Sequence, residues 1–238
     1  MADSLDRISR DVVRCERCPR LRSWCEEVAR VRRRAFRDET YWGRPVPGFG
    51  DPAARILLVG LAPAAHGANR TGRMFTGDDS GNWLYAALHA EGLASQPTSV
   101  SRDDGLKLTG AFITATCRCA PPDNKPTPEE RLACSEYLDR ELDRLQSVRV
   151  VLALGKIGWD AVLDRARRVD KAAFPKPVPA FWHGSEAKLV VRKGARPVVL
   201  LGSYHPSRQN TNTGVLTREM LAGIMRRARV LASPGGGR

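Results

Sequence analysis

Residues 55–60, "RILLVG", decide the fold of this 238-residue chain. A short run of Ile, Leu and Val that ends in glycine is typical of a strand buried on both faces of a sheet. Three later runs have the same character: "GAFITATCRCA" at 110–120, "VRVVLALG" at 148–155 and "RPVVLLGSYHPS" at 196–207. The sequence therefore predicts four core strands.

Helical patterns alternate with these strands. Helices are expected over residues 4–34, 80–93, 127–146, 156–167 and 213–231. Thr127 and Glu130 form a capping box at the start of one helix, and Ser80 is the expected N-cap of another. Strands that alternate with helices indicate an α/β fold, in which helices cover both faces of a parallel sheet.

The chain shows no internal repeat and no second-domain boundary, so residues 1–238 are expected to form one domain. Residues 1–54 would supply an N-terminal helix and a loop rich in Pro and Gly. Residues 188–191 would add a short extra strand, and a flexible tail is expected over 232–238.

The loops that follow the core strands carry most of the polar residues. They begin at Gly60, Cys119, Gly155 and Ser203. In open parallel α/β sheets, ligands bind outside the carboxyl ends of the strands. Three of these loops should therefore converge at one edge of the sheet. The longest of them, "GLAPAAHGANRTGRMFTGDDSG" at 60–81, would form a wall of the site.

The chain is strongly basic, with 39 Lys and Arg against 26 Asp and Glu and a formal net charge of +13. Such an excess favours partners rich in phosphate, with nucleic acid first and an anionic membrane second. Nine arginines and three acids fall between Arg14 and Arg37, and on a helix they would form a cationic face. No apolar run could span a membrane and no signal peptide is visible, so we expect a cytoplasmic protein.

Six cysteines raise the question of a metal or cluster site, because a chain without an export signal is not expected to hold a disulfide framework. Cys15 and Cys18 form a C-x-x-C pair. Further ligands would come from distant segments, unlike the paired knuckles of a zinc ribbon. Such thiolates fit an iron–sulfur cluster as well as zinc, and buried structural cysteines are the alternative. The remaining cysteines are Cys25, Cys117, Cys119 and Cys134.

The long segment 60–81 is not a phosphate loop of a familiar kind. It lacks both G-x-G-x-x-G and G-K-[ST], so an enzyme for dinucleotides or triphosphates is not expected. It carries two adjacent acids, Asp78 and Asp79, of which one would cap the next helix and leave the other free for chemistry. His205 and Asn124 lie in the other two loops and offer hydrogen-bond donors.

These motifs together resemble the family 5, or type B, uracil-DNA glycosylases of bacteria and archaea. The similar segments are "GLAPAAHGANRTGRMFTGD" at 60–78, "CAPPDNKPTPEE" at 119–130 and "FWHG…SYHPSRQNTNTG" at 181–214, in the family's order. The resemblance runs over nearly the whole chain. It implies a three-layer α/β/α uracil-DNA-glycosylase fold around a four-stranded parallel sheet. It also implies a structural 4Fe–4S cluster, with the ligands Cys15, Cys18, Cys119 and Cys134.

The resemblance assigns roles at the edge of the sheet. Leu61 stands where related glycosylases carry an acid or Asn, so the catalytic carboxylate would come from Asp78. Ionised Asp78 would stabilise the cationic sugar and orient water, and His205 would donate to the departing base. Asn124 completes the expected catalytic set. The flipped base would contact Ala62, Phe75, Asn124 and His205, and the DNA would contact Asn69, Arg70, Ser207, Arg208, Gln209 and Asn210.

The expected function is the excision of uracil, and of hypoxanthine, xanthine or ethenocytosine, from DNA to leave an abasic site. The expected protein is a monomer associated with the nucleoid. Two other classes fit the same residues. One is a non-catalytic iron–sulfur DNA-binding protein of this fold, in which Asp78 and His205 would be dispensable. The other is a zinc-bearing enzyme that processes nucleotides or RNA.

Overall fold

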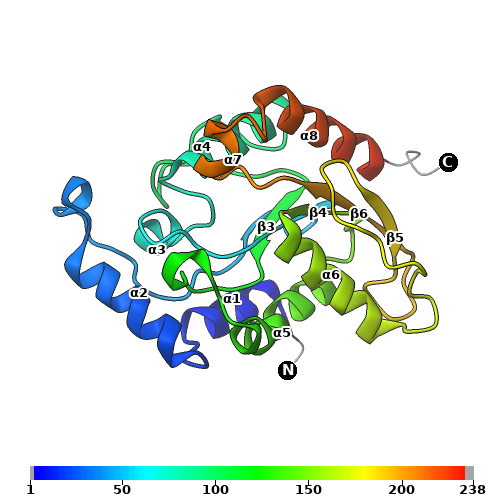
Figure 1. The fold of residues 1–238 in the computed structure, drawn as a ribbon, viewed down its shortest axis with the longest axis horizontal. Helices are drawn as coiled ribbons and strands as arrows, with labels where there is room; N and C mark the ends of the chain where they lie inside the picture. Colours follow the sequence, from blue (N-terminus) through cyan, green and yellow to red (C-terminus); the bar gives the residue numbers. More distant parts are fainter. Residues whose placement is uncertain (1–2, 234–238) are drawn as a thin grey trace.

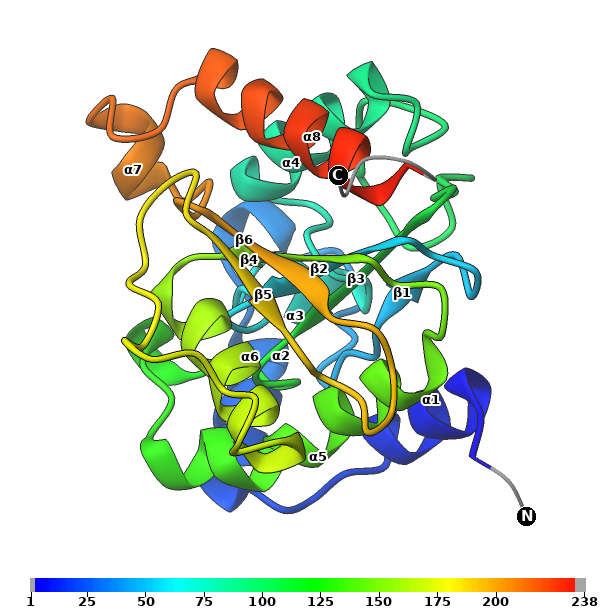
Figure 2. The same ribbon diagram turned by 90° about the vertical axis from the view of Figure 1, so that its right-hand side faces the viewer.

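The structure is a computed structural model that describes residues 3–233. At its centre lies a six-stranded sheet with the strand order β1-β3-β2-β4-β6-β5 (Figures 1 and 2). The four inner strands are parallel to one another. They are β3 (Ala111–Ala115), β2 (Ile56–Gly60), β4 (Val150–Leu154) and β6 (Val198–Ser203). The four predicted core strands are therefore confirmed as the centre of the fold.

An antiparallel strand extends the sheet at each edge. β1 (Phe49–Gly50) pairs with β3, and β5 (Glu186–Leu189) pairs with β6. β5 overlaps the short strand expected at 188–191, whereas β1 lies in a segment that the sequence presented as loop. Two paired residues are too few to show an alternating pattern, so the sequence carried no sign of β1.

Successive side chains of the inner strands point to opposite faces of the sheet and pack against two layers of helices. Ile56 and Leu58 of β2 belong to one hydrophobic core and Leu57 to the other. Figure 1 shows helices on both sides of the sheet, as the three-layer prediction requires. The first layer holds α4 (Asp79–Ala90) and α8 (Arg218–Ala232), and the second holds α5 (Pro128–Arg144) and α6 (Lys156–Val169).

The starts of α5 and α6 follow the sequence, whereas α8 begins at Arg218 and not at residue 213. In the capping box of α5, Thr127 accepts a hydrogen bond of 3.2 Å from the Glu130 N–H, and Glu130 accepts one of 2.8 Å from the Thr127 N–H. For α4 the sequence offered two kinds of cap, Ser80 or one of the adjacent acids, and the acid is confirmed. Asp78 caps this helix and accepts a hydrogen bond of 2.9 Å from the Gly81 N–H. Its carboxylate also suits the positive end of the helix dipole.

The N-terminal segment, expected to be helical over residues 4–34 with a turn at the C-x-x-C pair, forms two helices divided at that turn. α1 (Leu5–Val13) and α2 (Pro19–Val31) are separated by a turn that carries Cys15 and Cys18. Proline is well suited to the first position of a helix, so the turn ends where α2 begins. Figure 1 shows both helices on the α5 side of the sheet.

Several shorter helices lie in segments that the sequence presented as turns or loops. They are α3 (Ala68–Thr71), α7 (Arg208–Asn212) and the 3₁₀ turns η1 (Arg34–Phe36) and η2 (Pro122–Asn124). The tail expected over 232–238 lies outside the described residues from 234 onward, and Ala232 still belongs to α8. No helix within residues 3–233 is long and apolar enough to cross a membrane.

Candidate active site

Of the three loops expected to converge, those after β2, β3 and β6, the loops after β2 and β6 meet at the carboxyl edge of the sheet, beside Gly155 at the end of β4. The rings of Phe75 and His205 lie 5.8 Å apart, centroid to centroid, with 30° between their planes. Phe75 lies over Gly60, the last residue of β2, because a Cβ added there would stand 3.1 Å from the ring. A Cβ added at Gly155, directly after β4, would stand 3.6 Å from the Cβ of His205. Phe75 and His205 therefore face each other above the centre of the sheet edge.

Phe75 is held by an unusual backbone conformation. Its φ angle is +53°, in the left-handed region that bulky residues rarely adopt. Its carbonyl oxygen would lie 1.9 Å from a Cβ at Gly81, so any other residue at this position would collide with the loop. Strain of this kind is concentrated at functional sites. Gly81 is thus a site residue that the sequence analysis did not single out.

Asp78 occupies the end of the same loop. One carboxylate oxygen, Oδ1, accepts the capping hydrogen bond from the Gly81 N–H. The other, Oδ2, lies against Gly67 and would stand only 2.0 Å from a Cβ added there. Burial raises the pKa of Asp78, and the neighbouring charge of Asp79 raises it further, whereas the hydrogen bond from Gly81 lowers it. The carboxylate is therefore fixed from two sides and poorly hydrated.

Asp79 points to a different partner. Its carboxylate forms an ion pair with Arg208 of α7, which joins the start of α4 to the loop after β6. The two adjacent acids are thus distinguished by geometry. Asp78 lies half-buried against its own loop, and Asp79 holds the neighbouring loop in place.

His205 is half-buried at the exit of β6, and its backbone carbonyl accepts a hydrogen bond of 2.9 Å from the Asn210 side chain. Burial lowers the pKa of the His205 imidazole to about 4. At neutral pH the ring is therefore uncharged, with one nitrogen that donates and one that accepts.

Asn124 and Ala62 lie at the same edge, away from this pair. Asn124 is exposed in η2, where it and Asp123 both have positive φ angles of +56° and +52°. In the described structure no hydrogen bond joins the Asn124 side chain to Asp78 or His205. Ala62 is half-buried. It packs against a small hydrophobic core that includes Cys117 and Cys134.

The expected DNA contacts divide into two groups. Asn69 and Arg70 are buried, and their side chains bond within the protein. Asn69 donates to the carbonyls of Cys25 and Ala65 at 3.3 and 3.4 Å. These two side chains are therefore not on a surface that DNA could reach. The other expected contacts lie at α7, where Arg208 and Gln209 are exposed and Ser207 and Asn210 are half-buried.

Arg70 instead organises the long loop. It donates hydrogen bonds of 2.8 Å to the carbonyls of His66 and Gly77, and it pairs with Glu39. Its guanidinium lies 3.9 Å from the ring centre of Phe36. The resemblance gave Arg70 as a DNA contact, because nothing in the sequence pattern shows that this guanidinium is turned inward.

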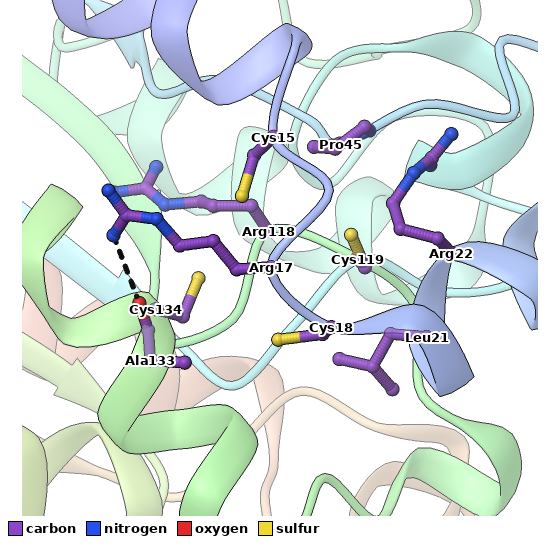
Figure 3. Close-up of a pocket in the computed structure, with 10 residues that line it drawn as sticks. All are labelled: Cys15, Arg17, Cys18, Leu21, Arg22, Pro45, Arg118, Cys119, Ala133 and Cys134. Atoms are coloured by element: carbon purple, nitrogen blue, oxygen red, sulfur yellow. Dashed lines mark hydrogen bonds between the residues drawn. The ribbon is translucent and has the colours of Figure 1, made fainter.

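The four expected cluster ligands line one pocket, together with Arg17, Arg22 and Arg118 (Figure 3). Figure 3 shows four sulfur atoms turned toward a common space, from the α1–α2 turn, the loop after β3 and helix α5. Arg118 is buried, and its Nε and Nη1 atoms have no hydrogen-bond partner among the described residues. The ligands concerned are Cys15, Cys18, Cys119 and Cys134.

Four thiols from three segments share this pocket with three arginines, a donor set that suits a group of negative charge such as a 4Fe–4S cluster bound by four thiolates. Within residues 3–233, no group of three or more His, Cys, Asp or Glu side chains is placed to hold a single metal ion. Arg118 is already paired with Glu141 at 2.6 Å through its Nη2 atom.

Comparison with known proteins places the chain in a family. The model of the Uracil DNA glycosylase superfamily matches residues 47–229. The "Type-5 uracil-DNA glycosylase" of Thermus thermophilus is 55% identical over 92% of this chain and 94% of its own length. The protein of the same name from Mycobacterium leprae is 52% identical over 97% of both chains. A "Type-4 uracil-DNA glycosylase" of Archaeoglobus fulgidus is 30% identical over 65% of this chain and 61% of its own length.

The chain therefore belongs to the uracil-DNA glycosylase superfamily and, within it, to the type-5 family. This membership agrees with the resemblance that the motifs indicated. The three-layer fold around a parallel sheet is the fold that the resemblance implied.

Proposed function

We propose that the protein is a DNA-repair enzyme that removes uracil from DNA by hydrolysis of the N-glycosidic bond. The observation that carries the proposal is the Phe75–His205 pair, 5.8 Å apart, with the half-buried Asp78 on the same loop as Phe75. An aromatic face, a neutral donor and a carboxylate are the groups that this reaction needs. They stand at the sheet edge of a chain of the type-5 family.

The reaction begins with base flipping, because a base inside a duplex cannot reach the site. Extrusion costs about a few kcal/mol, which stacking of the uracil on Phe75 offsets in part. Asn124 offers an amide donor and acceptor to the edge of uracil. Because the Asn124 side chain is exposed in η2, it would close on the base when DNA binds. Ala62 would lie beside the base. Its methyl side chain has no hydrogen-bonding group that could distinguish the edge of one base from that of another.

Cleavage separates charge across the bond between sugar and base. The electron pair of the C–N bond leaves with uracil, so C1′ of the sugar becomes cationic. Ionised Asp78 stabilises this cation and accepts a proton from the water that attacks C1′. Two fixed contacts, with the Gly81 N–H and with Gly67, hold the carboxylate in one orientation.

His205 serves the departing base. Its imidazole is neutral because burial lowers its pKa to about 4, so it donates an N–H without carrying charge into the site. The donor faces the uracil oxygen on which negative charge accumulates, as in an oxyanion hole. Ser207, Arg208, Gln209 and Asn210 would contact the DNA strands beside the extruded nucleotide.

The substrate range is a further part of the proposal. Leu61 supplies no polar group next to the base, so exclusion of other deaminated bases would be weak. Hypoxanthine, xanthine and ethenocytosine would therefore also be excised. The proposal also includes a place at the nucleoid, where the DNA substrate lies, and a monomeric protein.

A 4Fe–4S cluster would be held by Cys15, Cys18, Cys119 and Cys134. When bound it would supply a rigid cross-link and no redox step, because hydrolysis transfers no electrons. The cross-link would tie the α1–α2 turn to the loop after β3 and to α5, beside the Ala62 end of the long loop. Cys25 and Cys117 are buried beside these ligands and are not part of the set.

One experiment tests the glycosylase activity. The protein is incubated with a uracil-containing duplex, and abasic sites are then cleaved with alkali. We expect strand scission by the wild type and a large loss in Asp78→Ala and His205→Ala. Absence of scission by the wild type would instead favour the non-catalytic DNA-binding protein, and full activity in Asp78→Ala would overturn the proposed role of Asp78. Duplexes with hypoxanthine, xanthine and ethenocytosine in parallel define the substrate range.

A further inference from the structure

Residues 31–39, which we call the basic arm, connect the end of α2 to the strand-rich body of the protein. Figure 1 shows the arm, in blue, projecting beyond the end of α2 on the side where α3 lies. The arm contains the 3₁₀ turn η1 (Arg34–Phe36) and four arginines. The proposed reaction uses no residue of the basic arm.

The structure shows less unpaired positive charge on α2 than the sequence predicted. The expected cationic face of α2 is largely neutralised, because its arginines have carboxylate partners. The pairs are Arg20 with Glu130 at 2.8 Å, Arg22 with Glu26 at 2.8 Å and Arg30 with Glu27 at 2.6 Å. Helix α2 therefore offers DNA far less free charge than its sequence suggests.

The arm differs in this respect. Arg33, Arg34 and Arg37 are exposed and line an open surface hollow with Ala35. In the part of the chain that the structure describes, no ion pair or side-chain hydrogen bond engages Arg33 or Arg34. Arg37 has only its neighbour Asp38, at 3.6 Å. Two arginines held at the surface without partners are free to bind an anion.

The arm is fixed to the loop that carries the active site. Phe36 lies under the Arg70 guanidinium at 3.9 Å, and Glu39 forms an ion pair with Arg70. The hydroxyl of Tyr41, just after the arm, lies 3.1 Å from Nδ1 of His66 and accepts from the backbone N–H of Arg33 at 3.4 Å. The charges of the arm are thus carried on the same rigid assembly as Phe75 and Asp78.

We propose that the basic arm is a second DNA-binding surface, on which Arg33 and Arg34 contact backbone phosphates of the duplex that flanks the extruded base. The proposal rests on the proposed function, since it needs DNA at the carboxyl edge of the sheet. A guanidinium matches the oxygens of a phosphodiester in both charge and geometry. Such contacts position the duplex and carry no sequence information.

The test compares two double variants of the full chain. Arg33→Ala/Arg34→Ala removes two charges from the arm. Lys193→Ala/Arg196→Ala removes two exposed charges from the loop before β6, at the opposite edge of the sheet. Affinity for a fluorescein-labelled duplex with a tetrahydrofuran abasic site is measured against KCl concentration. A plot of the logarithm of the association constant against the logarithm of the KCl concentration has a negative slope. In the arm variant this slope should be smaller in magnitude by about 2, since each phosphate contact contributes about 0.9.

The control variant should keep the wild-type slope, and Arg33→Lys/Arg34→Lys should keep most of it. Equal slopes in the arm variant and the wild type would overturn the proposal. Because the substituted side chains are exposed, thermal unfolding should be unchanged, which checks that the variants fold. Uracil excision by the wild type is measured separately. Its absence would remove the proposed function, whereas the salt dependence would still decide whether the arm binds DNA.

Discussion

Arg70 donates a hydrogen bond of 2.8 Å to the carbonyl of Gly77, the residue that directly precedes Asp78. The same guanidinium bonds to the His66 carbonyl and pairs with Glu39. Gly77 has a φ angle of +78°, and a Cβ there would meet the Arg70 guanidinium at 2.4 Å. A buried arginine thus fixes the backbone that sets the direction of the Asp78 carboxylate, which we propose to be catalytic.

Arg70→Lys should therefore slow catalysis without weakening DNA binding. Lysine keeps the charge but cannot bond to two carbonyls and a carboxylate in one plane. A displacement of about 1 Å at the carboxylate lowers the rate by roughly 100-fold. Single-turnover excision measures the rate, and affinity for an abasic duplex measures binding. Glu39→Gln is the matched control, because it leaves the contact with Gly77 in place. A loss of affinity without a loss of rate would return Arg70 to the role of a DNA contact.

Gly67→Ala should displace Asp78. The added methyl group would meet Oδ2 at 2.0 Å, so the carboxylate must turn away. We expect an excision rate about 10–100-fold lower in single-turnover assays. Gly223→Ala in α8 has open space around it and should keep the wild-type rate.

Substitution of a cysteine at this pocket should have one of two outcomes, which depend on whether the residue is a proposed cluster ligand. Cys18→Ala should lose the visible absorption and the iron of the purified protein, and its melting temperature should fall by about 2–4 °C for each kcal/mol of lost stability. Cys117→Ala, a neighbour outside the proposed set, should retain its iron. A colourless anaerobic preparation with one equivalent of zinc would exclude the cluster.

Much of this site follows from the pattern of strands and loops. A buried strand that ends at Gly60 places the next loop at the carboxyl edge, and the same argument places His205 after β6. That argument brings segments together but cannot orient side chains. It gave no sign that Arg70 turns inward, or that Asp78, the acid proposed for chemistry, is also the cap of α4. Those outcomes depend on contacts between segments that are adjacent only in the folded chain.

The geometry of Asp78 and Asp79 also predicts how activity depends on pH. The proposed reaction needs Asp78 ionised, so the rate rises with pH through the pKa of this carboxyl. Burial raises that pKa, and so does the charge of Asp79. The rate should therefore begin to fall at a higher pH than an exposed aspartate would allow. His205 adds no step near neutral pH, because its pKa is lowered to about 4 and the ring gains a proton only in more acid solution.

Asp79→Asn tests this interpretation. The substitution removes a negative charge next to Asp78, so the pKa of Asp78 falls and the acid limb of the rate profile moves to lower pH. Asp79→Glu keeps the charge and should leave the limb close to that of the wild type. The substitution also removes the ion pair with Arg208, and this loss would affect DNA binding. Single-turnover rates measured across the acid range separate the shift of the acid limb from that effect on binding. An acid limb that stays in place in Asp79→Asn would mean that the limb reports a group other than Asp78.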